Sequence, residues 1–143
     1  MPSDGFFKAM NKVHRGLLKL SGGRLGWTVG RMPVLALTTT GRRTGRSRSV
    51  MLTVPHEENG ELVIVASKGG EDKHPAWFLN IQANPQVVIA LEGGAACEMI
   101  ARVASPEERA RLWAVVTGKR GNYARYQTKT VREIPLVLLG PVV

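Results

Sequence analysis

The chain has very little cysteine, and Cys97 is the single thiol among its 143 residues. One thiol cannot close an internal disulfide, and the only histidines, His14, His56 and His74, are too scattered to form a zinc motif with it. We therefore expect neither a disulfide framework nor a bound metal. A domain of this length buries roughly two thirds of the surface of its unfolded chain, so its core suffices without such supports.

Long hydrophobic runs are also missing. The longest segment without a charged side chain, His74 to Leu91, is interrupted by two prolines and four amide side chains, so it does not suit a bilayer. The sequence also lacks a basic start that runs into an apolar stretch and a small-residue cleavage site, which is the pattern of a secretory signal. These absences predict a cytoplasmic protein.

Aromatic residues are few, at 6% of the chain, and no predicted strand interleaves them as stacking platforms for bases. Acidic residues are scarce in the first third, where residues 1–48 hold ten Lys and Arg against the single Asp4. The remaining 95 residues hold ten of each sign, so the whole net charge of +9 lies in the first third. This imbalance predicts an anionic partner, and the lack of stacking aromatics argues against nucleic acid.

The spacing of apolar residues predicts an amphipathic helix over residues 6–20, with lysine and arginine on another face. Gly22 and Gly23 suit its end, so we assign residues 1–24 to this helix and residues 25–143 to the domain that follows. Two interpretations are open. The helix packs on the core with a solvated basic face, or it lies as a peripheral contact on the anionic inner face of the cell membrane.

Beyond the helix, short apolar and β-branched runs are separated by glycine, proline and asparagine, which is typical of strands. Glu58-Asn59-Gly60 and Glu92-Gly93-Gly94 are hairpin turn signals, so at least two neighbouring pairs should be antiparallel. The six predicted strands are Val34–Thr40, Ser49–Val54, Leu62–Ala66, Val87–Glu92, Ala96–Val103 and Ile134–Leu139.

Two shorter helices are predicted between the strands. Proline opens the segment Pro75–Gln82, and Ser105-Pro106-Glu107-Glu108 is a capping box that starts a helix reaching Gly118. Short antiparallel strands with few helices favour a mainly β fold with α (α+β), as a small barrel or sandwich.

The segment Gly41–Arg48 places four arginines and two glycines between two predicted strands. Guanidinium groups offer paired donors to phosphate or carboxylate, and glycine lets the backbone N–H groups approach an anion. The spacing does not match a P-loop, which needs four residues between its glycines. A solvated basic turn is the plainer interpretation, but four arginines in seven residues favour an anion-binding loop.

Two further segments carry chemistry. Ser67 and Lys68 follow a strand and precede Trp77, a combination that suits a planar ligand with polar edges, although Trp77 also suits core packing. Tyr123 and Tyr126 lie among basic residues near the C-terminus, where a phenol near a ligand can donate a proton. A hydrolase signature around a serine or cysteine nucleophile is absent.

Five motifs together resemble the deazaflavin-dependent nitroreductase family of mycobacteria and related actinobacteria, over about residues 25 to 141. They are T-T-T-G-R-R-T-G-R-S-R at 38–48, A-S-K-G-G at 66–70, H-P-A-W-F-L-N at 74–80, A-N-P at 83–85 and Y-A-R-Y-Q-T-K-T-V-R-E-I-P at 123–135. The resemblance implies a split β-barrel of about six antiparallel strands. It also implies an enzyme that passes a hydride from a reduced 8-hydroxy-5-deazaflavin (coenzyme F420) to quinones, α,β-unsaturated carbonyl compounds or nitroaromatics.

The same resemblance implies roles for individual residues. The coenzyme's phosphate and glutamyl tail would bind the arginine loop, and Ser67 and Trp77 would border its ring system. Tyr123, Tyr126 and Ser67 would be the catalytic residues, with the tyrosines on the acceptor side. The implied coenzyme-binding residues are Arg42, Arg43, Thr44, Gly45, Arg48, Ser67, Lys68 and Trp77.

Two other functions are alternatives to this reductase. One is a non-catalytic lipid- or membrane-surface-binding protein of the same fold, which would use residues 6–20 and a hydrophobic barrel cavity. The other is a nucleic-acid-binding module, which the charge favours and the aromatic content disfavours. We expect a small-molecule hydride acceptor, no nucleic acid, and a monomer or weak dimer.

Overall fold

The structure is a computed structural model, and it describes residues 28–29, 32–91 and 95–142. The predicted helix over residues 6–20, and the division into residues 1–24 and 25–143, fall largely on residues outside this description. They remain predictions.

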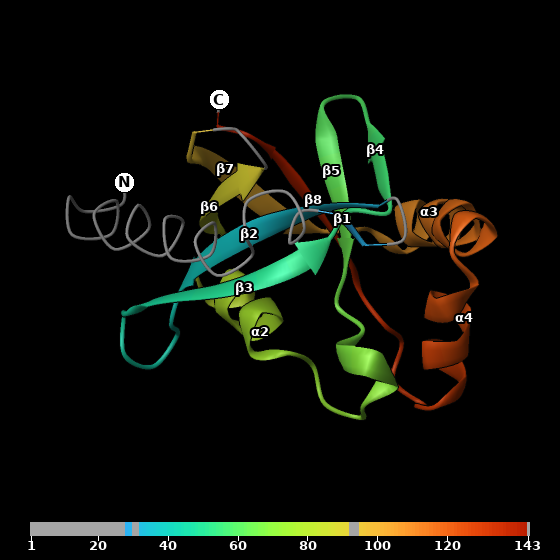
Figure 1. The fold of residues 1–143 in the computed structure, drawn as a ribbon. Helices are drawn as coiled ribbons and strands as arrows, with labels where there is room; N and C mark the ends of the chain where they lie inside the picture. Colours follow the sequence, from blue (N-terminus) through green and yellow to red (C-terminus); the bar gives the residue numbers. More distant parts are fainter. Residues whose placement is uncertain (1–27, 30–31, 92–94, 143) are drawn as a thin grey trace.

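The described residues form one antiparallel sheet of eight strands, in the order β1-β2-β6-β7-β8-β5-β4, with β3 paired to β2. Figure 1 shows that this sheet is strongly curled. The mainly β, α+β class predicted from sequence is confirmed. The strands are β1 (Thr28–Val29), β2 (Met32–Thr40), β3 (Ser47–Thr53), β4 (His56–Glu58), β5 (Glu61–Val65), β6 (Gln86–Leu91), β7 (Cys97–Val103) and β8 (Leu136–Pro141).

All six predicted strands are present, as β2, β3, β5, β6, β7 and β8. The second predicted hairpin turn lies between the antiparallel pair β6–β7, as expected. The first joins β4 to β5, and the predicted strand Ser49–Val54 that precedes it pairs with β2 as β3. Between β4 and β5, Asn59 (φ 51°) and Gly60 (φ 76°) both adopt the left-handed conformation that a tight hairpin turn requires. The short strands β1 and β4 were not predicted. β1 has only two residues, and β4 is charged and lacks alternating hydrophobicity. Its hydrogen bonds to β5 define it instead.

The described part of the chain also contains four helical segments: η2 (Lys68–Gly70), α2 (Ala76–Ala83), α3 (Pro106–Lys119) and α4 (Gly121–Thr128). The capping box of α3 is confirmed, since the Ser105 hydroxyl accepts from the Glu108 N–H and the Glu108 carboxylate accepts from the Ser105 N–H. Sequence reasoning missed α4, whose Gly, Asn and Tyr residues are weak helix formers. Burial of the Tyr123 side chain stabilises this helix, whose intrinsic helix propensity is low.

Two hydrophobic clusters hold these elements together. The first lies between the sheet and α2 and includes Leu37, Ile64 and Phe78. The second lies beneath α3 and α4 and includes Leu112 and Tyr123. Figure 1 shows α2 close to β2 and β3, with α3 and α4 together at the other side of the molecule. The segment around η2 therefore lies between the two helical layers, where it contacts α4.

No helix in the described part of the chain is long and apolar enough to cross a membrane.

Candidate functional site

The arginine loop lies at the tip of the β2–β3 hairpin, as its position between two predicted strands required. The loop is closed by two backbone hydrogen bonds, Gly41 N–H to Arg46 O (2.7 Å) and Gly45 N–H to Gly41 O (2.9 Å). Gly45 has a φ of +71°, a conformation that L side chains rarely adopt, and the Thr44 hydroxyl accepts from Arg46 N–H (3.2 Å). Gly45 thus shapes the loop and does not line a cavity.

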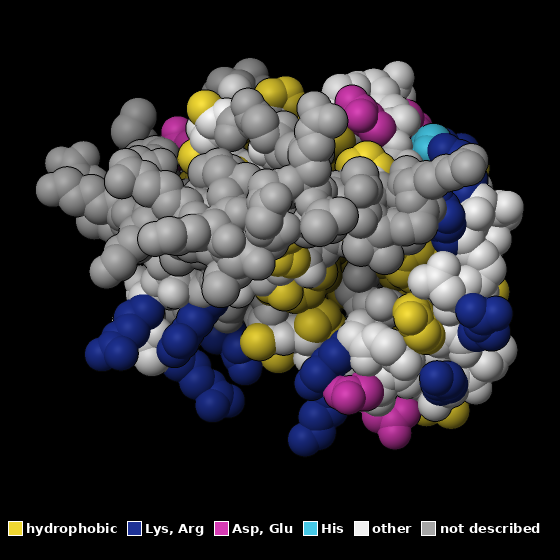
Figure 2. Space-filling model, in the orientation of Figure 1, with side chains coloured by type: hydrophobic (Ala, Val, Ile, Leu, Met, Phe, Trp, Pro, Cys, Tyr) yellow, Lys and Arg dark blue, Asp and Glu magenta, His cyan; other side chains and the backbone are white. Residues whose placement is uncertain are grey.

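The loop presents a cationic surface. Arg42, Arg43, Arg46 and Arg48 are all exposed, and Figure 2 shows Lys and Arg side chains gathered around the tip of the β2–β3 hairpin. Among the described residues, neither the Arg43 nor the Arg48 side chain makes a hydrogen bond or an ion pair. Their guanidinium donors are therefore available for an anion.

Asn80 of α2 anchors this loop from below. Its Oδ1 accepts hydrogen bonds from the Arg42 backbone N–H (3.1 Å) and from Arg42 Nη1 (3.4 Å), and its Nδ2 donates to Thr39 Oγ1 (3.0 Å). Both Asn80 and Thr39 are buried. An unpaired buried amide is costly, so this arrangement fixes the loop relative to α2.

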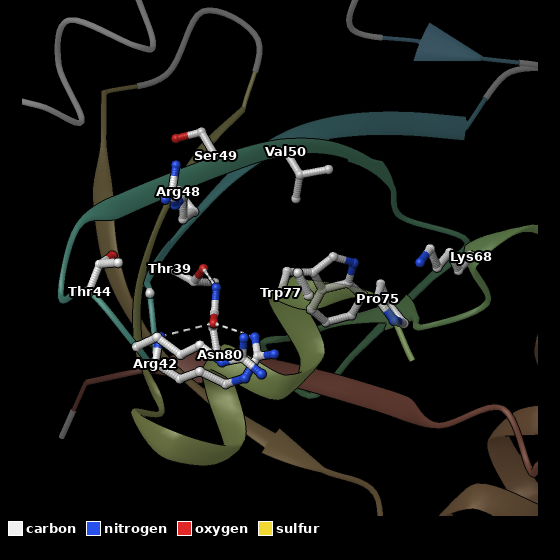
Figure 3. Close-up of a pocket in the computed structure, with 13 residues that line it drawn as sticks. Thr39, Arg42, Thr44, Arg48, Ser49, Val50, Lys68, Pro75, Trp77 and Asn80 are labelled. Atoms are coloured by element: carbon white, nitrogen blue, oxygen red, sulfur yellow. Dashed lines mark hydrogen bonds between the residues drawn. The ribbon is translucent and has the colours of Figure 1, made fainter. Parts of the chain in front are cut away.

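The first cavity lies between the arginine loop and α2 and has a volume of about 520 Å³, within the usual range for small-ligand sites. Figure 3 shows Arg48 and Thr44 at one end, Lys68 at the other, and the indole of Trp77 between them. The cavity is lined by Thr39, Gly41, Arg42, Arg43, Thr44, Arg48, Ser49, Val50, Lys68, Pro75, Ala76, Trp77 and Asn80.

Trp77 has both of the roles considered from sequence. Its side chain is buried and meets the Phe78 ring edge-on (centroids 6.3 Å apart), so it belongs to the core. It also forms part of the cavity wall. A ring that is fixed by packing is a well-ordered surface for a planar ligand.

Ser67 and Lys68 lie in a tight turn at η2. Ser67 is buried, and its carbonyl accepts a hydrogen bond from Gly70 N–H (2.9 Å). Lys68 has a φ of +46°, which is unusual outside glycine, and its ammonium pairs with the Glu71 carboxylate (3.2 Å). The Lys68 side chain is about half exposed, at 44%, so this ion pair is weak and can be exchanged for another anion.

Gly70 allows the turn to touch α4. Its φ is +85°, and a Cβ at this position would lie 2.6 Å from the Tyr126 carbonyl oxygen and 3.1 Å from Lys129 Cβ. No side chain fits there without displacing the helix. Gly70, the second glycine of the A-S-K-G-G motif, therefore sets how closely the Ser67–Lys68 turn approaches Tyr126.

The two predicted tyrosines lie together on α4, with ring centroids 6.1 Å apart in an edge-to-face arrangement. The Tyr123 hydroxyl bonds Thr53 Oγ1 of β3 (2.7 Å), and burial raises the pKa of Tyr123. The phenol therefore stays neutral at physiological pH. Tyr126 is half-buried, Lys129 Nζ lies 5.7 Å from its ring centroid, and its hydroxyl makes no hydrogen bond to another described residue.

A second cavity, of about 450 Å³, is lined by both tyrosines. It lies beside the first, because the two cavities share four wall residues, Val50, Lys68, Pro75 and Trp77. The remaining residues of the second cavity are Met51, Leu52, Thr53, Val65, Ser67, Gly69, Asn122, Tyr123 and Tyr126.

The structure brings nearly all of the predicted site residues together. Arg42, Arg43, Thr44 and Arg48 line the first cavity, Ser67, Tyr123 and Tyr126 line the second, and Lys68 and Trp77 line both. Gly45 alone lies outside both walls.

Sequence reasoning missed Asn80, Thr53 and Arg132, whose guanidinium binds the Ser67 carbonyl (2.9 Å). Asn80 had a usable signal, because it is an amide on the otherwise apolar buried face of α2. Thr53 and Arg132 had none, since their partners are 70 and 65 residues away in sequence.

Comparison with known proteins assigns the chain to a family. The family model for the F420H(2)-dependent quinone reductases matches residues 10–141. An F420H(2)-dependent quinone reductase of Mycobacterium tuberculosis (strain ATCC 25618 / H37Rv) is 37% identical over 132 residues, which cover 90% of this chain and 87% of the relative.

Two solved structures are also similar. An F420-H2 dependent reductase, FDR-A, has a TM-score of 0.65 and 42% identity over 75% of this chain and 93% of its own. The second structure, described as a domain-swapped dimer, has a TM-score of 0.67 and 35% identity over 92% of this chain and 97% of its own.

The fold and the site thus define a split β-barrel with two adjacent cavities, one with arginines in its wall and one with tyrosines. The chain belongs to the F420H(2)-dependent quinone reductase family. The resemblance to deazaflavin-dependent reductases, stated from motifs alone, and the split-barrel fold that it implied are confirmed.

We predict that Asn80→Ala lowers the free energy of unfolding by about 1–3 kcal/mol, because Arg42 N–H and Thr39 Oγ1 lose a buried partner. Urea unfolding measures this change, and limited trypsin digestion should cleave the loosened arginine loop faster. The control is Gln82→Ala on the exposed face of the same helix, which should change neither. Equal stability of the two variants would show that the anchor is energetically unimportant.

Proposed function

We propose that this chain is a reductase that uses reduced coenzyme F420 and passes a hydride to quinones, α,β-unsaturated carbonyl compounds or nitroaromatics. One observation carries the proposal, namely two adjacent cavities with a shared wall, the first lined by Arg43 and Arg48 and the second by Tyr123 and Tyr126. The first cavity suits an anionic coenzyme tail, and the second suits an acceptor that gains negative charge. The family description and the name of the mycobacterial relative support the same chemistry.

The residues present fit this coenzyme. Its phosphate and glutamyl tail carry several negative charges, and Arg43 and Arg48 offer guanidinium donors that no described residue occupies. Lys68 lies on the shared wall and can exchange its exposed ion pair with Glu71 for the ligand. The apolar wall of Val50, Pro75 and Trp77 suits a planar ring system.

The coenzyme supplies the hydride when it is bound, so the chain needs no nucleophile of its own. The protein's task is to orient the acceptor, to exclude water and to place a proton near the oxygen that becomes negative. Tyr126 suits the last task, because it lines the second cavity and its hydroxyl makes no hydrogen bond to another described residue.

Tyr123 and Ser67 have supporting positions in the same cavity. The Tyr123 hydroxyl is oriented by Thr53 Oγ1 (2.7 Å), and it can still donate to an acceptor when the threonine hydroxyl is the donor between them. Ser67 is buried at the start of the η2 turn and lines the cavity beside Gly69. We assign these three hydroxyls to the catalytic side.

Location and assembly remain predictions. The peripheral membrane contact depends on residues 6–20, which lie outside the described residues, and nothing found here favours the non-catalytic lipid-binding alternative. The cytoplasmic location and the monomeric or weakly dimeric state are likewise predictions. The domain-swapped dimer is a property of a related protein.

The direct test of this function is a binding titration with oxidised coenzyme F420 beside FMN. We expect saturable quenching of the intrinsic tryptophan fluorescence by the deazaflavin and much weaker binding of FMN, which lacks the glutamyl tail. Comparable affinity for both, or binding of neither, would contradict the assignment. A chain that binds the coenzyme but reduces no quinone, enone or nitroaromatic would contradict the catalytic part alone.

We predict that Arg43→Ala and Arg48→Ala each weaken coenzyme binding by about 1.5–3 kcal/mol, the usual scale for hydrogen bonds that involve charged groups. Added salt should reduce wild-type affinity in the same direction, because screening acts over about 8 Å at physiological ionic strength. Arg125→Ala is the control, since Arg125 is exposed on α4 and lines neither cavity. Unchanged affinity in both loop variants would remove the arginine loop from the site.

We predict that Tyr126→Phe lowers kcat by at least about tenfold, because one hydrogen bond formed in the transition state is worth about a decade or more in rate. The ring remains, so coenzyme affinity should barely change. Steady-state kinetics with saturating reduced coenzyme and a soluble quinone measures the effect. Tyr123→Phe tests the second phenol in the same assay. Wild-type kcat in both variants would show that the tyrosines only pack against their neighbours.

A further inference from the structure

Arg132 makes an unusually complete set of hydrogen bonds around the turn that carries Ser67 and Lys68. Its Nε donates to the Glu71 carbonyl (2.8 Å), Nη1 to the Ala66 carbonyl (3.3 Å), and Nη2 to the Ser67 carbonyl (2.9 Å). Nη1 also lies 3.1 Å from Nδ1 of His74. One guanidinium therefore binds both ends of the turn and the segment that leads to α2.

We propose that Arg132 is the positioning residue for the catalytic turn, with His74 as its side-chain acceptor; we name this pair and its hydrogen bonds the Arg132 clamp. The clamp holds Ser67 and Lys68 at the wall shared by the two cavities. This inference rests on the proposed function, because it assigns the geometry of that same site to a residue outside it.

The turn needs an external support because its own backbone is in an uncommon conformation. Lys68, Gly69 and Gly70 have consecutive φ values of +46°, +64° and +85°. Glycine adopts such values readily, but at Lys68 the conformation is uncommon and persists only where surrounding contacts determine it. Inside the turn there are two backbone hydrogen bonds, Gly70 N–H to Ser67 O (2.9 Å) and Glu71 N–H to Lys68 O (3.2 Å).

The clamp is also fixed from the other side. Gln127 Nε2 on α4 donates to the Arg132 carbonyl (2.7 Å), and Gln127 Oε1 accepts from Ile134 N–H (2.9 Å) and Arg109 Nη2 (3.2 Å). Gln127 follows Tyr126 in the chain. Arg132 thus joins the turn with Ser67 and Lys68 to the helix with the catalytic phenols, so it sets the distance between the two walls of the second cavity.

The clamp requires neutral His74, because Nδ1 accepts from a cation. Burial, first, and the Arg132 charge, second, lower the pKa of His74 below its ordinary value of 6.5. The other charged groups of this segment are Asp72, which acts on Arg132, Glu71, which pairs with Lys68, and Lys73; the Phe78 ring (4.8 Å) is uncharged. The contact is therefore fully present above about pH 6.5 and is lost as the pH falls through the lowered folded pKa.

The test compares Arg132→Met with Arg125→Met, which removes the same charge from an exposed site on α4. Hydrogen exchange of the free protein reports on the Gly70 and Glu71 amides. We expect exchange at 66–74 to rise at least about tenfold in Arg132→Met alone, since several hydrogen bonds from a charged donor are lost. The dissociation constant for oxidised coenzyme F420 should rise in the same variant. Unchanged exchange in folded Arg132→Met would overturn the clamp.

His74→Asn keeps an acceptor near the Nδ1 position but does not titrate. We expect the protection factors at 66–74, which correct for the slower intrinsic exchange of amides at lower pH, to fall in the wild-type protein between pH 7 and pH 5 and to stay constant in the Asn variant. This profile also decides the question if Arg132→Met does not fold, because an equal acid response in both proteins would overturn the assignment. The exchange measurements need no ligand, so failure of the coenzyme titration alone would contradict the proposed function and leave the clamp standing.

Discussion

The site depends first on the pairing of β2 along both of its edges. β2 pairs antiparallel with β3 on one side, from Val34↔Thr53 to Thr40↔Ser47, and with β6 on the other. The seven-residue ladder with β3 fixes the arginine loop at one end of the hairpin and Thr53 at the other. Since Thr53 bonds Tyr123, a single hairpin sets the separation of the arginine loop from the tyrosines. Asn80 then fixes the loop to α2, and the turn at η2 closes the remaining wall.

Charge and burial are divided between the two ends in a way that suits their different tasks. The arginines of the loop are exposed, so their field reaches into solvent and can capture an anion at a distance. Tyr123 is buried, and burial raises its pKa, so the phenol remains a neutral donor beside any acceptor. Trp77 lies between these environments as a packed wall. An anionic tail and an apolar ring system on one ligand would match this gradient.

Sequence reasoning succeeded where the signal was local. The six main strands, the capping box at Ser105 and the Asn59-Gly60 turn each follow from neighbouring residues, and the charge count alone pointed to an anion. Helix α4 was missed because its propensity is weak and Tyr123 is ordered by a partner 70 residues away. Asn80 binds Arg42 from 38 residues away, and Arg132 binds Ser67 from 65. Asn80 and Arg132 lie inside the quoted motifs, but their partners are distant in sequence, so the motifs alone do not show what these two side chains bind.

The polar side chains of this barrel divide into two groups. Arg43 and Arg48 are without described partners and are free to bind, whereas Arg132 uses its three guanidinium nitrogens to bind the protein itself. A flexible cation suits capture, but a turn with three consecutive positive φ values needs a rigid, planar donor with several fixed directions. Lysine offers a single charged point and cannot reach separate carbonyls in that way. Arginine at position 132 therefore follows from the backbone geometry of the turn and not from the charge of the ligand.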